Sequence, residues 1–265
     1  MVPHTRKPYH KSREIGCDGY LGQYITAGGI KTYYEIHGEG EPLVLMHGGT
    51  CTIETLCEQT NELAKRYRVI LPERRGHGRT PDVEGHITYE LMAQDTVAFM
   101  EELGLKNAHL VGYSDGADVG LLMAISRPDL VGKLVSISGN FASDGLTERA
   151  RRWIESATPQ TWLPSLADLY KKTSPDGPAH FAIIVDKIKR MWLEGPRITR
   201  EQLGSVKAPT LVMVGDRDII TLEHTISLFR AIPNAHLFVV PGASHSLISE
   251  KPNLVNRAIL DFLAA

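Results

Sequence analysis

The chain has 265 residues, of which 42 % are hydrophobic and 23 % are charged. This length and composition are those of an ordinary globular protein with one large or two small domains and a sizeable core. The net charge of −2, without a long basic run, argues against a nucleic-acid partner, and no apolar run is long enough to cross a membrane.

Strand and helix signals alternate along most of the chain. In chain order they predict an arm at 1–20, strands at 23–27, 30–36 and 42–46, a helix at 53–67, a strand at 68–71, a helix at 88–103, a strand at 107–113, a helix at 117–126 and a strand at 133–137. Charged and aromatic helical segments fill 141–206, after which a strand at 210–214, a helix at 222–230, a strand at 237–240 and a helix at 253–263 resume the alternation.

This order predicts an α/β fold with a mostly parallel sheet that is covered by helices on both faces. The core is expected at 21–140 and 207–265. The segment 141–206 is expected to form a helical cap inserted after the sixth strand.

The cysteines and the N-terminus bear on the compartment. Residues 1–13 are basic and polar and lack the apolar stretch of a secretory signal. Cys17, Cys51 and Cys57 are odd in number and have no metal-type spacing, so we interpret them as thiols in a reducing, cytoplasmic compartment. Metal-binding and phosphate-binding motifs are absent, and no cofactor is expected.

The pentapeptide Gly112-Tyr113-Ser114-Asp115-Gly116 lies between a predicted strand and a predicted helix. Gly-x-Ser-x-Gly in that context is typical of a tight strand-to-helix turn that exposes a serine hydroxyl. Serine is a weak nucleophile unless a base removes its proton and a third group orients that base. We therefore predict Ser114 as a nucleophile with partners elsewhere in the chain.

Two loops at the ends of later strands supply candidates for those partners. His245 follows the predicted strand at 237–240 and is expected to be the base. The strand at 210–214 leads into Asp216-Arg217-Asp218, where we prefer Asp218 over Asp216 as the acid because it lies further into the loop. The order Ser114, Asp218, His245 is that of nucleophile, acid and base in hydrolases with this type of turn.

An acyl-transfer site also needs hydrogen-bond donors for the oxyanion of the transition state. The backbone N–H of Asp115, the residue after the nucleophile, is one candidate. The second is the N–H of Gly49, because the small residues of His47-Gly48-Gly49-Thr50 let the backbone approach a substrate.

Together these motifs resemble the α/β-hydrolase superfamily over nearly all of residues 22–265. The resemblance implies an eight-stranded sheet with a helical cap. Glu73 departs from the pattern, because aspartate usually precedes the Arg-Gly-His-Gly stretch there. The markers are His47-Gly48-Gly49, Arg75-Gly76-His77-Gly78, the Gly112–Gly116 turn, Gly215-Asp216-Arg217-Asp218 and Pro241-Gly242-Ala243-Ser244-His245.

Within the superfamily, the sequence of the Gly112–Gly116 turn, together with Asn140, resembles that of the valacyclovir hydrolase (biphenyl-hydrolase-like) group. In that group the acidic residue beside the nucleophile helps to recognise an amino group, and the matching position is Asp115. The alternative for Asp115 is a structural acid at a helix N-terminus, with its charge neutralised by a protein Arg or Lys. Residues expected to contact the substrate are Thr50, Tyr113, Asp115, Trp162 and Trp192.

The sequence therefore predicts a serine hydrolase of carboxylic esters, with lactones and aminoacyl esters as further substrates. The same motifs leave open a cofactor-free perhydrolase (haloperoxidase), a carbon–carbon bond hydrolase and a ligand receptor with slow turnover. The expected partner is a small-molecule ester, with no membrane or nucleic acid, and a homodimer is left open.

Overall fold

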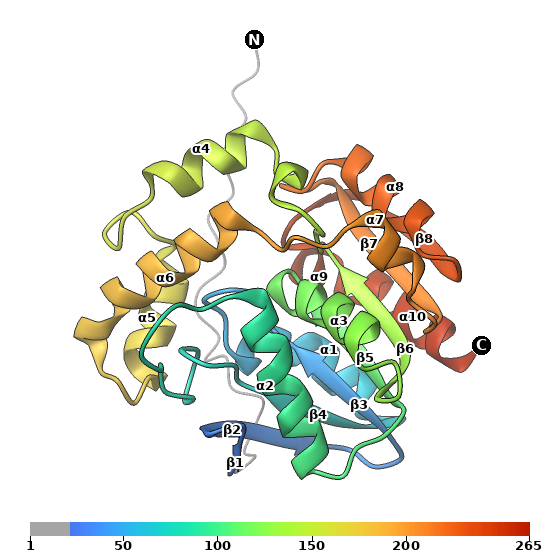
Figure 1. The fold of residues 1–265 in the computed structure, drawn as a ribbon, viewed down its shortest axis with the longest axis horizontal. Coiled ribbons are helices and arrows are strands. Elements are labelled where there is room, and N and C mark those ends of the chain that lie inside the picture. Colours follow the sequence, from blue (N-terminus) through green and yellow to red (C-terminus); the bar gives the residue numbers. More distant parts are fainter. Residues whose placement is uncertain (1–21) are drawn as a thin grey trace.

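Residues 22–265 are described by a computed structural model, and the arm predicted at 1–20 lies outside them. Within this range eight strands form one sheet in the order β1-β2-β4-β3-β5-β6-β7-β8 (Figure 1). The strands are β1 (Gln23–Ala27), β2 (Ile30–His37), β3 (Glu41–Met46), β4 (Tyr67–Pro72), β5 (Ala108–Tyr113), β6 (Val131–Ile137), β7 (Thr210–Arg217) and β8 (Ala235–Ser244).

The sheet is mostly parallel, as predicted. Strands β3 to β8 run parallel to their neighbours, whereas β1 pairs antiparallel with β2, and β2 with β4. The β1–β2 hairpin turns at Gly28 and Gly29, which both have positive φ. All six parallel strands therefore end at the same edge of the sheet.

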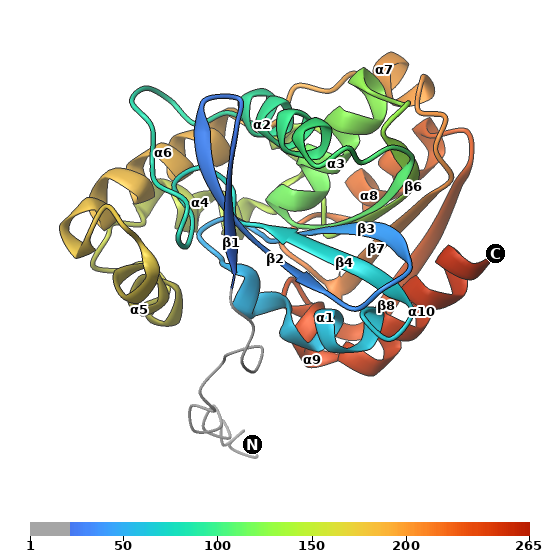
Figure 2. The same cartoon turned by 90° about the horizontal axis from the view of Figure 1, so that it is seen from below.

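Helices bury both faces of this sheet. In β3, Val44 and Met46 join one apolar cluster and Leu43 and Leu45 the other, because successive side chains of a strand point to opposite faces. Figure 2 shows this layered arrangement. One face is covered by α2 (Tyr89–Glu102), α3 (Asp115–Ser126) and α8 (Leu222–Ala231), and the other by α1 (Cys57–Leu63), α9 (Leu247–Glu250) and α10 (Pro252–Ala264).

Between β6 and β7 the chain forms helices instead of strands. The helices α4 (Glu148–Ser156), α5 (Pro164–Thr173) and α6 (Phe181–Glu194) lie together on one side of the molecule, away from α10 (Figure 1). The short α7 (Arg200–Gly204) instead packs on α3 and α8. The cap inserted after the sixth strand is thus present.

The boundaries of β7, β8 and the helix predicted at 53–67 differ most from the prediction. Strands β7 and β8 are longer than predicted, because their pairing shifts register after Gly215 and resumes between Arg217 and Ser244. The helix predicted at 53–67 is a 3₁₀ turn (Ile53–Leu56) followed by α1, since β4 already begins at Tyr67.

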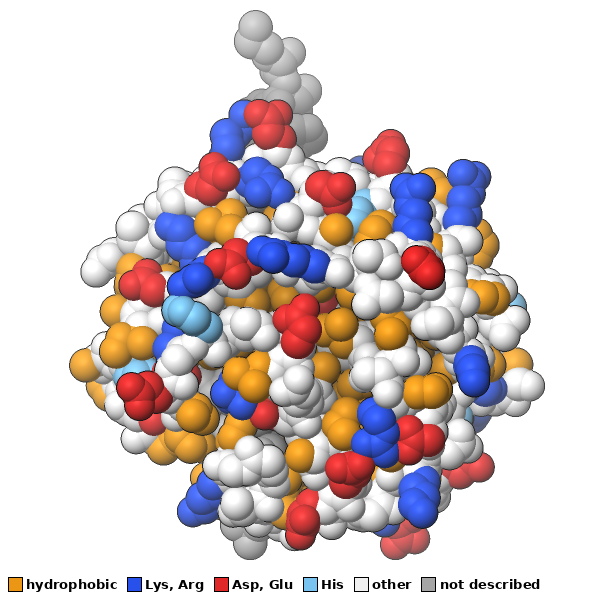
Figure 3. Space-filling view, in the orientation of Figure 1, with side chains coloured by type: hydrophobic (Ala, Val, Ile, Leu, Met, Phe, Trp, Pro, Cys, Tyr) orange, Lys and Arg blue, Asp and Glu red, His pale blue; other side chains and the backbone are white. Residues whose placement is uncertain are grey.

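The cysteines differ from the prediction. Cys57 is disulfide-bonded and Cys51 is a buried free thiol, so the prediction of three thiols is wrong and cysteine usage no longer supports a reducing compartment. Among residues 22–265, no helix combines the length and the apolar character needed to cross a membrane. On the face shown in Figure 3, basic and acidic side chains are interspersed.

Candidate active site

Ser114 lies between the end of β5 and the start of α3, at the edge where the parallel strands end. Its backbone has φ 53° and ψ −123°, a strained conformation for a residue with a side chain. Such a turn persists only where its surroundings enforce it.

Two glycines allow this turn. A Cβ atom at Gly112 would lie 2.2 Å from the carbonyl oxygen of Gly116, and one at Gly116 would lie 2.4 Å from the carbonyl oxygen of Met46. Both positions are pressed against backbone, so no side chain fits. The turn is thereby held against the end of β3, whose following loop begins at His47.

The three residues predicted as nucleophile, acid and base are hydrogen-bonded in series. The Nε2 atom of His245 lies 3.0 Å from Ser114 Oγ, and its Nδ1 atom lies 2.7 Å from Asp218 Oδ1. With the Nδ1 hydrogen donated to the carboxylate, Nε2 is free to accept the serine proton. Asp218 rather than Asp216 therefore makes the contact with His245.

The carboxylate of Asp218 is fully buried but well supplied with donors. Ser138 Oγ donates to Oδ2 at 2.5 Å, and the backbone N–H of Ile220 donates to Oδ1 at 3.1 Å. Burial favours the neutral acid, but the charge of His245 and these hydrogen bonds outweigh it, so the pKa of Asp218 is lowered below its ordinary 3.8. Asp218 is therefore an ionised partner for His245 at neutral pH.

Backbone and side-chain contacts also fix the loop that carries His245. The hydroxyl of Tyr113 donates to the carbonyl oxygen of His245 at 3.0 Å, and the N–H and Oγ of Ser244 donate to the carboxylate of Glu250. Tyr113, predicted to contact substrate, thus supports the histidine loop with its hydroxyl group.

The loop after β3 lies directly against this assembly. A Cβ at Gly48 would lie 3.2 Å from Ser114 Cβ, and one at Gly49 would lie 2.3 Å from a carboxylate oxygen of Asp115. The carbonyl oxygen of Gly48 accepts hydrogen bonds from His47 Nδ1 (2.7 Å) and Arg74 Nη2 (3.2 Å). The peptide that carries the Gly49 N–H is therefore held from one side.

The carboxylate of Asp115 is buried under the cap, with the residue only 3 % exposed. Oδ1 accepts a hydrogen bond from the hydroxyl of Tyr89 at 3.0 Å, and the indole N–H of Trp192 lies 2.9 and 3.0 Å from Oδ1 and Oδ2. Burial raises the pKa of Asp115, although Arg74 and the two donors act in the opposite direction. The side chain thus connects α3 to both α2 and α6.

A second contact joins the cap to the loop after β3. The indole N–H of Trp162 donates to Thr50 Oγ1 at 3.3 Å, and the rings of Trp162 and Trp192 stack with centroids 5.3 Å apart. Thr50 has φ 53°, which is unusual for a β-branched residue. The predicted substrate residues Thr50, Asp115, Trp162 and Trp192 are therefore in one connected group.

The sequence did not predict three residues that contact the site. Ser138 directly follows β6 without forming a motif, Tyr89 begins α2, and Arg74 directly precedes Arg75-Gly76-His77-Gly78. Only the position of Ser138 after a parallel strand carried a signal. Cys51 is close by, but burial raises the pKa of its thiol to about 11, so it is not an activated nucleophile.

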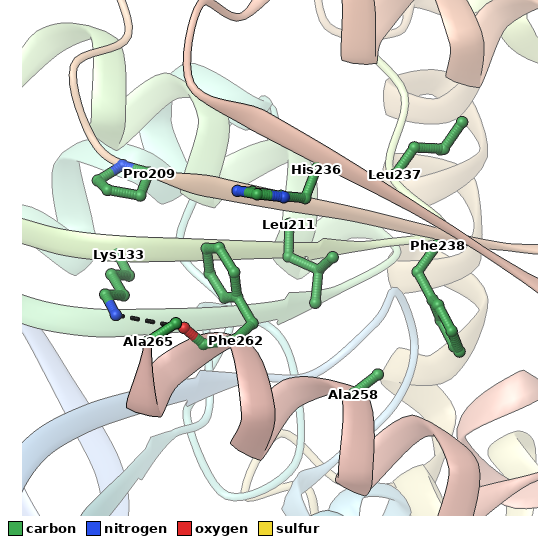
Figure 4. A pocket seen from close by; sticks show the side chains of 9 residues that line it. All are labelled: Lys133, Pro209, Leu211, His236, Leu237, Phe238, Ala258, Phe262 and Ala265. Carbon is green, nitrogen blue, oxygen red and sulfur yellow. Dashed lines mark hydrogen bonds between the residues drawn. The ribbon is translucent and has the colours of Figure 1, made fainter.

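A cavity of about 540 Å³ lies far from these residues (Figure 4). It is bounded by the amino-terminal parts of β6, β7 and β8 and by α10, at the end of the sheet opposite to Ser114. Neither Ser114 nor Asp218 nor His245 lines it. Its lining residues are Lys133, Pro209, Leu211, His236, Leu237, Phe238, Ala258, Phe262 and Ala265.

Comparison with known proteins identifies the family. The model of the Alpha/beta hydrolase family matches residues 43–258. The chain belongs to this family. "Putative carbamate hydrolase RutD" of Azorhizobium caulinodans is 26 % identical over 257 residues, covering 90 % of this chain and 97 % of that protein. The 2-hydroxy-6-oxo-2,4-heptadienoate hydrolase of Pseudomonas putida is 27 % identical over 267 residues, covering 92 % and 97 %.

Solved structures agree on the fold. The meta-cleavage product hydrolase CumD of Pseudomonas fluorescens superposes with a TM-score of 0.78 at 22 % identity, covering 92 % of this chain and 98 % of that one. These relatives support the superfamily predicted from the motifs, and none of them is a valacyclovir hydrolase.

The turn at Ser114 should not tolerate a side chain at position 112. We expect Gly112→Ala to cost about 3 kcal/mol or more in the free energy of unfolding, because the new methyl group meets backbone that cannot rotate away. Thermal unfolding measures this. Gly204→Ala is the control, since its Cβ would have no neighbour closer than 3.9 Å, and equal melting temperatures for the two variants would contradict the packing argument.

Removing the hydroxyl of Ser138 should weaken the stabilisation of the ionised Asp218 carboxylate. We expect Ser138→Ala to lower kcat/KM about tenfold, because a buried carboxylate loses a donor. Since the folded pKa of Asp218 lies below 3.8, its ionisation stabilises the fold above that pH, and this stability is lost as pH falls through the folded pKa. The variant should therefore lose less stability between pH 7 and pH 3.

The control for this variant is Ser249→Ala, which removes an exposed hydroxyl group near the same histidine loop. Kinetics and unfolding of both variants across this pH range make the comparison. If Ser138→Ala behaves like Ser249→Ala, Ser138 does not support Asp218.

Proposed function

We propose that this member of the family is a serine hydrolase of carboxylic esters that works through an acyl-serine intermediate. The observation that carries the proposal is the hydrogen-bonded series Asp218–His245–Ser114 at the end of β5. A base within 3.0 Å of a serine hydroxyl, oriented by a buried carboxylate, is the arrangement that nucleophilic acyl transfer requires.

In the first half of the reaction His245 takes the proton of Ser114 as Oγ attacks the ester carbonyl. Asp218 keeps the Nδ1 hydrogen in place and stabilises the imidazolium that forms. The backbone N–H groups of Gly49 and Asp115 are the proposed donors to the oxyanion. Asp115 is the first residue of α3, so its N–H has no acceptor within the helix.

The first half ends when His245 gives that proton to the leaving alcohol as the ester C–O bond breaks, which leaves the acyl group on Ser114. In the second half His245 takes a proton from water, which attacks the acyl-serine, and returns it to Ser114 Oγ as the bond to the acyl group breaks. The product acid leaves and Ser114 recovers its proton. The cycle thus uses the side chains of Ser114, His245 and Asp218, two backbone N–H groups, the ester and water.

The family also makes related reactions candidates. Relatives are named as a non-heme chloroperoxidase, a 2-hydroxy-6-oxo-2,4-heptadienoate hydrolase and a carbamate hydrolase. Peroxide-dependent halogenation in acetate, turnover of ring-cleavage diketones and turnover of carbamates distinguish these activities from ester hydrolysis. Tight ligand binding with a single turnover would instead indicate a receptor.

Ester hydrolysis should depend on the hydroxyl of Ser114. We expect Ser114→Ala to lower kcat on p-nitrophenyl esters by about 10³-fold or more and to abolish labelling by a fluorophosphonate. Ser126→Ala, at the exposed far end of α3, serves as the control and should keep full activity. Full turnover by Ser114→Ala would reject the proposed function.

The finer resemblance to valacyclovir hydrolase makes aminoacyl esters a substrate class in which Asp115 binds an ammonium group. Its carboxylate is already bonded to Tyr89 and Trp192, and an ammonium group would have to displace the indole. We therefore expect Asp115→Asn to slow amino and non-amino esters equally, by about tenfold, because it loosens the contact between α3 and the cap. A loss confined to aminoacyl esters would instead assign Asp115 to the substrate.

A further inference from the structure

Arg74 is a buried cation to which no step of the proposed reaction assigns a role. It follows β4, which lies beside β3 in the sheet, and the residue is only 4 % exposed. Its Nε and Nη1 atoms are buried without a hydrogen-bond partner in the protein. An unsatisfied buried guanidinium is costly, so its presence calls for a physical reason.

The guanidinium reaches the loop after β3 through its remaining nitrogen. Nη2 donates to the carbonyl oxygen of Gly48 at 3.2 Å, and the backbone N–H of Arg74 donates to His47 Nε2 at 3.2 Å. With Nε2 accepting, the hydrogen of His47 is on Nδ1, which donates to the same carbonyl at 2.7 Å. Burial, followed by the charge of Arg74, holds the pKa of His47 well below 6.5, so the ring is neutral.

The carbonyl of Gly48 and the N–H of Gly49 belong to one peptide group. No peptide bond in residues 22–265 is cis, so these two groups point in opposite directions. His47 and Arg74 donate to this carbonyl, as does the backbone N–H of Cys51 at 3.4 Å, and these donors direct the Gly49 N–H away from Arg74. A positive charge at the carbonyl also polarises the amide and strengthens its N–H as a donor.

We propose that Arg74 is a positioning residue for the oxyanion hole, acting through the Gly48–Gly49 peptide. The inference rests on the proposed function, in which the Gly49 N–H stabilises the oxyanion. Arg74 orients that donor before the reaction and places a buried positive charge behind it. It also offsets the nearby negative charge of Asp115, which otherwise opposes the developing oxyanion.

The test is a comparison of Arg74→Met with the wild type. We expect kcat on p-nitrophenyl acetate to fall about 10- to 100-fold while KM stays within about twofold, because the peptide acts on the transition state. Inhibition by a trifluoromethyl ketone, whose hemiketal oxyanion occupies the same place, should weaken in parallel. Unchanged kcat, or a rise in KM alone, would overturn the proposal.

The matched control is Arg75→Met. Arg75 is a neighbouring buried arginine that pairs with Asp95 of α2 at 2.5 and 2.7 Å and has no contact with Gly48. This variant should lose stability but keep kcat within about twofold. An equal loss of kcat in both variants would show that Arg74 acts only through the stability of the fold.

Two further variants separate the remaining explanations. Arg74→Lys keeps the positive charge and should recover part of the kcat that Arg74→Met loses. If Arg74→Met does not fold, Arg74→Lys serves as the test, and a wild-type kcat in this variant would contradict the proposal. Adding Asp115→Asn to Arg74→Met should restore at most a small part of kcat, because the carbonyl of Gly48 still lacks the donor that Arg74 supplies. Full restoration would mean that Arg74 merely neutralises Asp115.

A wrong role for Arg74 and a wrong proposed function give different results in these experiments. If Ser114→Ala is inactive while Arg74→Met matches the wild type, only the role of Arg74 is wrong. If Ser114→Ala remains active, the esterase mechanism itself is wrong.

Discussion

The left-handed backbone of Ser114 is the constraint on which the site depends. A serine with φ 53° is unfavourable by itself, and it is stable here because Gly112 and Gly116 let β5, α3 and the end of β3 come into backbone contact. That contact places the hydroxyl at the edge where the parallel strands end. It also presses the loop after β3 against the nucleophile, which brings Gly48 and Gly49 to the reacting centre.

The partners of Ser114 follow from the sheet order. Strands β6, β7 and β8 lie in sequence beside β5, so Ser138, Asp218 and His245 emerge at one edge although they are far apart in the chain. The register shift between β7 and β8 extends both strands and sets Asp218 and His245 directly after their ends. The buried carboxylate then remains ionised because three donors surround it.

The cap is hydrogen-bonded to residues of the site and does not only cover it. Its two stacked tryptophans donate to Asp115 and Thr50, which adjoin the two proposed oxyanion donors. The same contacts leave Asp115 buried rather than open to a substrate. Cap and core therefore share hydrogen bonds at the point where chemistry is proposed.

Much of the fold and of the reactive series could be predicted because the responsible constraints are local. Short stretches of sequence contain both the glycines around Ser114 and the apolar strands that precede Asp218 and His245. Ser138, Tyr89 and Arg74 could not be predicted, because their roles depend on contacts between segments distant in the chain.

The central claim is that an acyl group is carried by Ser114 during turnover. Its most direct test is to quench the protein rapidly during hydrolysis of p-nitrophenyl acetate and to analyse its peptides by mass spectrometry. The account predicts a single acetyl group on the peptide containing Ser114, which disappears once the ester is consumed. Product formation without an acetyl group on Ser114, or with the acetyl group on another residue, would contradict it.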